Sequence, residues 1–148
     1  MEALAADAKH FDEPQVAVDG RMLPYEWIAG RSGRLIKTDA LDHHADDFFP
    51  ASRDVAWDVA GTIVEFDLGP DATSYLIAAY GSRSKDHTIA RRIGFYHSAY
   101  LTYRLGYVTM AAETLGDTPD GRRFTAIQTR HRRSLEVLSR DRHGARSG

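Results

Sequence analysis

The chain of 148 residues contains no cysteine. This absence excludes disulfide bonds, thiolate metal ligands and cysteine nucleophiles, and it fits a reducing compartment. The chain also lacks any run of the roughly 18–20 uncharged apolar residues that a membrane-spanning helix needs. Residues 1–11 include acidic residues and no long apolar stretch, so we expect no signal peptide. Together these absences predict a cytoplasmic protein that does not enter a membrane.

Charge is unevenly distributed along the chain, although the formal net charge is only −2. Residues 1–79 contain fifteen acidic residues against six lysines and arginines, whereas residues 122–148 contain eight arginines against two acidic residues. Such a basic segment can bind nucleic acid. Here the arginines recur at helical spacing without interleaved aromatic residues, which favours a solvated helix face and a frayed tail. We therefore expect no nucleic-acid partner.

The hydrophobic pattern predicts a mainly α (α+β) fold in which a short β-hairpin precedes a bundle of about four helices. An apolar fraction of 43% is enough for the core of one domain, which we place at residues 1–139, with a disordered tail at 140–148. Apolar runs around a glycine-rich turn predict the hairpin. The expected strands cover residues 15–18, 22–29 and 35–38, and the expected helices cover residues 53–67, 71–80, 86–115 and 122–139.

Unusual chemistry is concentrated in residues 39–58, which contain six aspartates and two histidines. Mg²⁺ prefers carboxylate oxygen and completes its coordination shell with water and substrate phosphate. Asp39 directly follows an apolar strand and is the strongest candidate ligand, whereas Asp42, Asp46 and Asp47 are interpreted as loop-solvating residues. The adjacent His43 and His44 match no closed zinc site, and hydrogen bonds to the loop backbone are favoured over transition-metal ligation.

Asp58 lies in the otherwise apolar stretch VAWDVAG. A carboxylate in such surroundings is normally tied to backbone N–H groups or to an arginine, because an unpaired charge is costly to bury. We therefore interpret Asp58 as a structural anchor for the preceding loop. Ser52 is the expected N-cap of the helix that contains Asp58, and Asp54 is expected in its first turn.

Three short motifs resemble the aminoglycoside and choline kinase family, a protein-kinase-like group of small-molecule phosphotransferases. The stretch Asp19-Gly20-Arg21-Met22-Leu23-Pro24-Tyr25-Glu26 is similar to the catalytic loop His-Gly-Asp-x-x-Pro-x-Asn. Lys37-Thr38-Asp39-Ala40 is similar to the metal-binding Ile-Asp-Trp/Phe segment, and Asp58-Val59-Ala60 to the Asp-Leu-Ala segment. The resemblance covers about residues 15–115 and implies the C-terminal lobe of a kinase-like fold.

The same resemblance implies ATP and Mg²⁺ as cofactors and assigns roles to four residues. Asp39 and Glu26 would be the metal ligands, Asp19 the acid/base group and Arg21 a phosphate-binding residue. Arg21 stands where the family has its catalytic aspartate, and Glu26 where it has an asparagine. Because an arginine can bind phosphate but cannot accept a proton from a substrate hydroxyl, the resemblance implies a degenerate catalytic loop.

The family's nucleotide-gripping N-terminal lobe, with its glycine-rich loop and strand lysine, has no counterpart in residues 1–18. Either the chain is a truncated reading frame or a fragment, or a separate partner chain supplies this lobe. An exposed apolar face where the lobe would dock would favour such a partner or a homo-oligomer. Three hypotheses remain open. The chain is a phosphotransferase-like domain that binds a divalent cation and a nucleotide or small phosphorylated molecule, a non-catalytic interaction module or relic (a pseudoenzyme), or a small metal-dependent hydrolase that uses the Asp/His loop.

Overall fold

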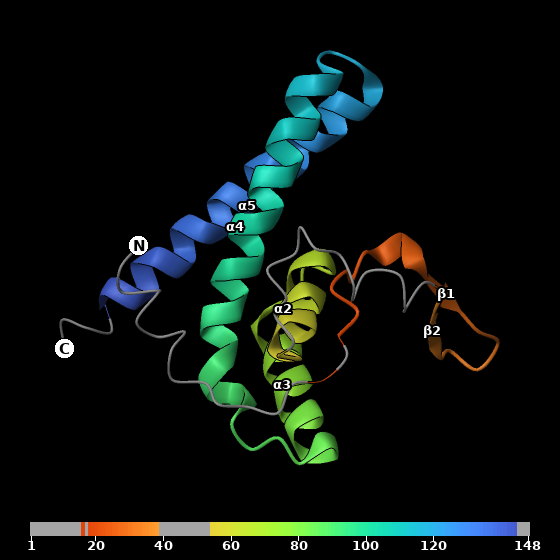
Figure 1. Cartoon of the computed structure of the whole chain (residues 1–148), viewed down its shortest axis with the longest axis vertical. Coiled ribbons are helices and arrows are strands. Elements are labelled where there is room, and N and C mark those ends of the chain that lie inside the picture. The colour runs from red at the N-terminus through yellow and green to blue at the C-terminus, as the bar shows by residue number, and fades with distance from the viewer. Residues whose placement is uncertain (1–15, 17, 39–53, 145–148) are drawn as a thin grey trace. The chain divides into compact units, whose positions relative to one another are not determined.

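The structure, a computed structural model, describes residues 16, 18–38 and 54–144 (Figure 1). The chain divides into two compact units, residues 1–97 and 98–148, and the division falls inside helix α4. The described residues form four α-helices and one two-stranded antiparallel sheet, so the predicted mainly helical fold with a preceding hairpin is confirmed. No helix in these ranges combines the length and apolar character needed to cross a membrane.

The hairpin consists of strand β1 (Trp27–Ala29) and strand β2 (Leu35–Lys37), and the 3₁₀ turn η1 (Pro24–Glu26) precedes it. Ile28 lies opposite Ile36 in the register. Gly33 has a φ of 74°, a conformation that favours glycine, and it shapes the turn between the strands. The first strand begins later than residue 22 because the segment from Pro24 forms η1. A strand over residues 15–18 is wrong for the two described positions, 16 and 18, which lie in no strand.

Helix α2 (Ala56–Glu65) is the most buried helix of the first unit, with seven of its ten residues buried. Asp54 lies two residues before its first residue, and one Asp54 carboxylate oxygen accepts the backbone N–H of Ala56 at 2.9 Å. Asp67 ends the helix region with a φ of 51°, and the Leu68 N–H donates to the Ile63 carbonyl at 3.0 Å. The buried apolar residues of this unit are Val18, Leu23, Ala56, Trp57, Val59, Ala60, Ile63, Val64, Ile89 and Ile93.

Helix α3 (Pro70–Ser84) begins with a proline in its first turn and ends where Lys85 adopts a φ of 60°. It therefore continues through Gly81, where the sequence pattern predicted a break. A Cβ on Gly81 would lie only 3.0 Å from the Asp86 carbonyl oxygen. Gly81 thus permits a close approach between α3 and the following loop.

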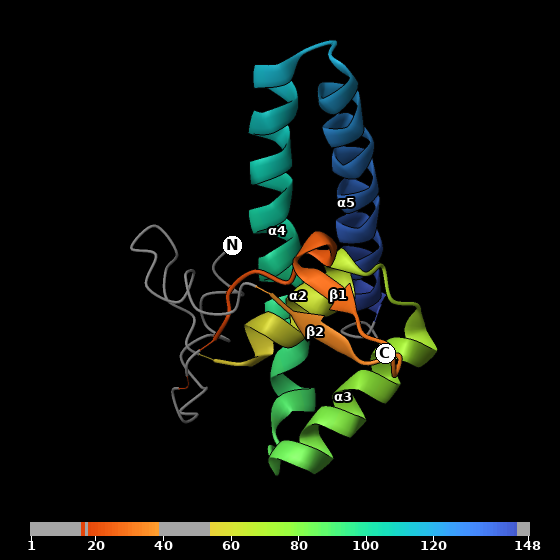
Figure 2. The ribbon, with the colours of Figure 1, turned by 90° about the vertical axis from the view of Figure 1, so that its right-hand side faces the viewer.

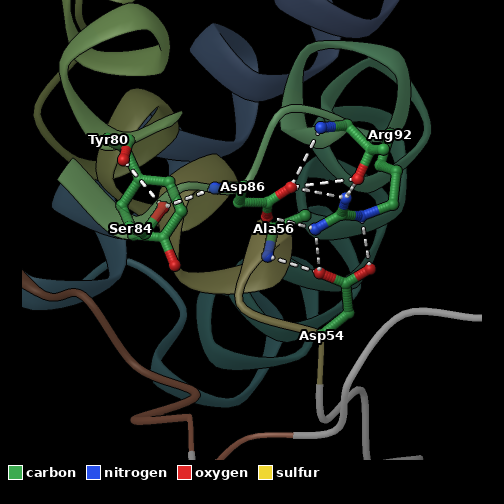
Figure 3. A network of polar contacts seen from close by, with 7 residues as sticks. Asp54, Ala56, Tyr80, Ser84, Asp86 and Arg92 are labelled. Atoms are coloured by element: carbon green, nitrogen blue, oxygen red, sulfur yellow. Dashed lines mark hydrogen bonds and ion pairs between the residues drawn. The ribbon is translucent and has the colours of Figure 1, made fainter. Parts of the chain in front are cut away.

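An ion cluster around Arg92 joins three segments of the first unit (Figure 3). The Arg92 guanidinium donates to both oxygens of Asp54, at 2.8 and 3.0 Å, and to both oxygens of Asp86, at 2.7 and 3.1 Å. It also donates to the Thr88 hydroxyl. Asp54 precedes α2 and Asp86 precedes α4, so a single arginine that is 1% exposed ties together the starts of two helices.

The second unit is an antiparallel pair formed by the C-terminal half of α4 (Ile89–Leu115) and α5 (Pro119–Gly144), as Figure 2 shows. Gln128 donates to the Thr109 hydroxyl at 2.9 Å, and the rings of Tyr107 and Phe124 meet edge to face with centroids 6.4 Å apart. The turn between the helices needs glycine, because a Cβ on Gly121 would lie 2.0 Å from the carbonyl oxygen of Gly116.

Helix α5 is longer at both ends than the predicted 122–139. It begins at Pro119 because the Thr118 hydroxyl accepts the Gly121 N–H at 3.0 Å and caps the first turn. It continues to Gly144, so residues 140–144 of the expected tail are helical, and residues 145–148 lie outside the described ranges. The expectation of one domain over residues 1–139 stays a prediction.

Replacing Arg92 with methionine should lower the free energy of unfolding by about 3–5 kcal/mol, because the carboxylates of Asp54 and Asp86, only 11% and 16% exposed, would lose their cation. Urea unfolding followed by circular dichroism measures this loss. Arg91→Met is the matched control, since Arg91 is the exposed neighbour on the same helix. Equal stability of the two variants would contradict a structural role for the cluster.

The same cluster should make the fold sensitive to acid. The Arg92 guanidinium lowers the pKa of Asp86 from 3.8 to about 2, even though burial opposes this shift. A lowered carboxylate pKa stabilises the fold fully above 3.8, and this stabilisation is lost as the pH falls toward 2. We expect the difference in unfolding free energy between the parent chain and Asp86→Asn to shrink across this window. A difference that stays constant from pH 5 to about 2 would count against the assignment.

Candidate functional site

Two consecutive residues of α2 hold the segment around Gly20. The Asp58 carboxylate accepts the backbone N–H of Asp19 at 2.8 Å and that of Gly20 at 2.9 Å. The Trp57 indole N–H donates to the Gly20 carbonyl at 3.1 Å. Both polar groups of Gly20 are therefore fixed by α2, and the segment cannot shift along the helix without breaking these bonds.

The local sequence explains why this arrangement forms. Gly20 has a φ of 82°, which side-chain-bearing residues rarely adopt. The turn that results points two successive N–H groups toward one carboxylate. Trp57 is 7% exposed and Gly20 is buried, so the indole needs a hydrogen-bond acceptor that the glycine carbonyl provides. Burial and backbone conformation thus favour the same contact.

An ion cluster lies directly beside this held segment. The Lys37 ammonium is 2.8 Å from a carboxylate oxygen of Asp19 and 3.0 Å from one of Glu26. The side chains of Lys37, Asp19 and Glu26 are only 10%, 11% and 8% exposed. In the hairpin register Lys37 lies opposite Trp27, the residue after Glu26, and the Thr38 N–H donates to the Glu26 carbonyl at 2.9 Å.

The electrostatics of the cluster favour a resident cation. Burial opposes the charged form of Lys37, but hydrogen bonds and charge attraction from Asp19 and Glu26 outweigh it and raise the pKa of Lys37. Burial raises the pKa of Asp58, and the two backbone N–H bonds only partly offset this effect. Three carboxylates, those of Asp19, Glu26 and Asp58, surround the ammonium of Lys37, which interacts with each of them.

The structure therefore brings together two of the four residues to which the resemblance assigned roles. Asp19 and Glu26 meet through Lys37. Arg21 follows Asp19 and its backbone N–H donates to the Asp19 carboxylate at 3.1 Å. Asp39 lies outside the described residues, as do Asp42, His43, His44, Asp46, Asp47 and Ser52. The assigned roles of metal ligand, acid/base group and phosphate contact stay predictions.

The prediction that Asp58 is tied to backbone N–H groups is confirmed. Among the described residues, the segment that Asp58 anchors is 18–21, which lies far from Asp58 in the sequence. Lys37 and Trp57 are the site residues that sequence reasoning missed. Lys37 was part of a quoted motif, but no spacing rule indicates that a strand lysine contacts carboxylates at positions 19 and 26.

The chain matches no family model, and neither a curated protein nor a solved structure matches it. Over the described ranges, no group of three or more histidine, aspartate or glutamate side chains is arranged to hold a metal ion. Glu26, the described member of the predicted ligand pair, instead contacts the ammonium of Lys37. The described donors therefore do not fit an open Mg²⁺ site, because a cationic side chain already contacts them.

Asp58→Ala should destabilise the first unit, because it leaves the N–H groups of Asp19 and Gly20 without an acceptor, at about 1–3 kcal/mol for each group. Urea unfolding of the full chain measures the loss. Asp71→Ala is the matched control, since Asp71 is an exposed aspartate in the first turn of α3. If both variants lose the same small amount of unfolding free energy, Asp58 only stabilises the helix terminus and does not anchor the segment around Gly20.

Proposed function

We propose that this chain is a catalytically degenerate phosphotransferase-like domain in which the ammonium of Lys37 takes the place of a divalent cation. One observation carries the proposal. Lys37 lies between Asp19 and Glu26, within 2.8 and 3.0 Å of their carboxylates, in surroundings that are nearly closed to solvent. The resemblance assigns these carboxylates to acid/base and metal-binding roles. A fixed ammonium would neutralise part of their charge without a metal.

The contacts of Asp19 support the loss of transfer activity. One of its oxygens accepts the Arg21 N–H at 3.1 Å, and the other pairs with Lys37 at 2.8 Å. A general base needs a carboxylate oxygen within hydrogen-bond reach of the substrate proton. Here both oxygens are engaged within the fold, and Arg21 cannot serve instead because its guanidinium stays protonated. Phosphate transfer would therefore lack its base.

Binding without transfer remains part of the proposal. An arginine is well suited to phosphate because its guanidinium presents several donors in a fixed plane. Arg21 is partly exposed and directly follows the segment that Asp58 holds. A small phosphorylated molecule or nucleotide is the ligand class that this residue would accept, with ATP and Mg²⁺ the first compounds to test.

A second candidate is a non-catalytic interaction module, which the solvent-facing side of the hairpin favours. Ile28 and Ile36 lie opposite each other and are 58% and 55% exposed. Tyr25 and Leu35, close by in the chain, are 77% and 58% exposed. Adjacent exposed apolar side chains are typical of contact surfaces. The mass of the purified chain in light scattering tests self-association through this side.

Lys37→Met should turn the cluster into a divalent-cation site. With the ammonium removed, Asp19 and Glu26 leave uncompensated negative charge that Mg²⁺ can neutralise. We expect millimolar Mg²⁺ to raise the melting temperature of Lys37→Met by several degrees and that of the parent chain by much less. Differential scanning fluorimetry at constant ionic strength makes the comparison.

The control is a triple variant, Asp19→Asn with Glu26→Gln and Lys37→Met, which removes the carboxylates together with the ammonium. It should show no specific response to Mg²⁺. An equal response in the parent chain would overturn the role of Lys37 as a built-in cation. Transfer of the γ-phosphate of ATP by the parent chain in the presence of Mg²⁺ would overturn the proposed degeneracy.

A further inference from the structure

A row of exposed arginines runs along one side of α5. At 3.6 residues per turn, Arg122, Arg133 and Arg140 project within about 20° of one another, and Arg123 and Arg130 project within about 100° of Arg122. All five side chains are exposed, and so is that of Arg132, which projects about 80° to the other side of Arg122. From Arg122 to Arg140 the row spans about 27 Å of helix. We call these five residues the arginine row.

The opposite side of α5 is occupied by packing. Its apolar residues Phe124, Ile127, Leu135 and Leu138 are partly buried, and His131 is 1% exposed. These residues project roughly 140–220° away from Arg122. The arginine row is therefore the solvent side of an amphipathic helix, and its charges are not needed for the packing of the second unit.

Acidic residues compensate the row only in part. Arg122 pairs with Asp117 at 2.6 Å, Arg123 with Asp120 at 3.0 Å and Arg140 with Glu136 at 3.9 Å, and these side chains are all more than half exposed. Such exposed pairs contribute little and compete poorly with another anion. Within the described part of the chain, Arg130 and Arg133 have no acidic partner. The middle of the row thus presents uncompensated positive charge.

We propose that the arginine row binds the phosphate backbone of a nucleic-acid duplex without reading its sequence. Residues 119–144 contain seven arginines and no lysine, and the guanidinium plane matches phosphate oxygens in pairs. A straight row of about 27 Å can follow a regular array of phosphates, and neutralising several of them releases bound counterions. This inference concerns α5 alone and is independent of the proposed function.

The composition of the row argues against two other anionic partners. A helix that lies on a membrane needs an exposed apolar side, but Val137, at 50% exposure, is the large apolar residue exposed on α5. Protein partners are usually anchored by buried apolar or aromatic contacts, which one valine does not provide. Single strands are held by stacking on aromatic rings, and the row has none, so a duplex is the better match.

The sequence by itself favoured a solvated face, because aromatic residues do not interleave with the arginines. Binding to a duplex backbone needs no stacking residues, since its bases stay paired. The new observations are the exposure of five arginines within about 100° of one another on one continuous helix and, among the described residues, the absence of acidic partners for Arg130 and Arg133.

The test uses the full chain and a fluorescein-labelled DNA duplex of about 20 base pairs with arbitrary sequence, followed by fluorescence anisotropy at several salt concentrations. The triple variant Arg130→Ala, Arg133→Ala, Arg140→Ala should bind roughly tenfold or more weakly at low salt. The plot of log affinity against log salt has a negative slope, and its magnitude should decrease by about 0.9 for each lost phosphate contact. Replacement of the same three residues by lysine should retain most of the binding.

The matched control removes three exposed arginines elsewhere, Arg31→Ala, Arg34→Ala and Arg83→Ala, and so changes the net charge equally. It should bind the duplex like the parent chain. An equal loss of duplex affinity in both triple variants would mean that net charge alone causes the effect, and it would overturn the proposal. Absence of duplex binding by the parent chain, or binding only to vesicles that contain anionic phospholipid, would overturn it as well. Circular dichroism confirms that each variant is folded.

Discussion

The arrangement of the candidate site depends on one carboxylate, that of Asp58. It accepts two successive backbone N–H groups, from Asp19 and Gly20, and so fixes a segment that lies 38 residues away in sequence. Its position in the first turn of α2 is fixed in turn by the Asp54 cap and the Arg92 cluster at the start of that helix. An interaction among buried groups at a helix start therefore determines where the Lys37 cluster forms.

The two ion clusters of the first unit differ in what they can do. Arg92 is almost fully buried and contacts two carboxylates, so this cluster holds one carboxylate more than its single guanidinium can neutralise. Its role is structural, because it ties the starts of two helices together. Lys37 also contacts two carboxylates, and one of these residues, Asp19, donates its backbone N–H to Asp58. The same physical element, a cation between two carboxylates, stabilises the fold in one place and fills a candidate site in the other.

Local sequence patterns predicted the elements better than their ends. Apolar spacing predicted the four helices and the hairpin, because periodic burial follows directly from residue order. The observed helix ends differed from the expected ones where local contacts or backbone conformation determined them. Helix α3 continued past Gly81 to Ser84, before Lys85 adopts a left-handed conformation, and Thr118 capped α5 earlier than expected. Such contacts are set by neighbours that periodicity does not reveal.

The sequence by itself determined the helical class, the hairpin and the need of Asp58 for backbone partners, because apolar periodicity and the cost of a buried charge are local properties. Only the tertiary structure decided which backbone Asp58 holds and that Lys37 lies between Asp19 and Glu26. The physical reason is that ion pairing between distant residues depends on the path of the chain between them. That path is fixed by burial and hydrogen bonding of the whole unit.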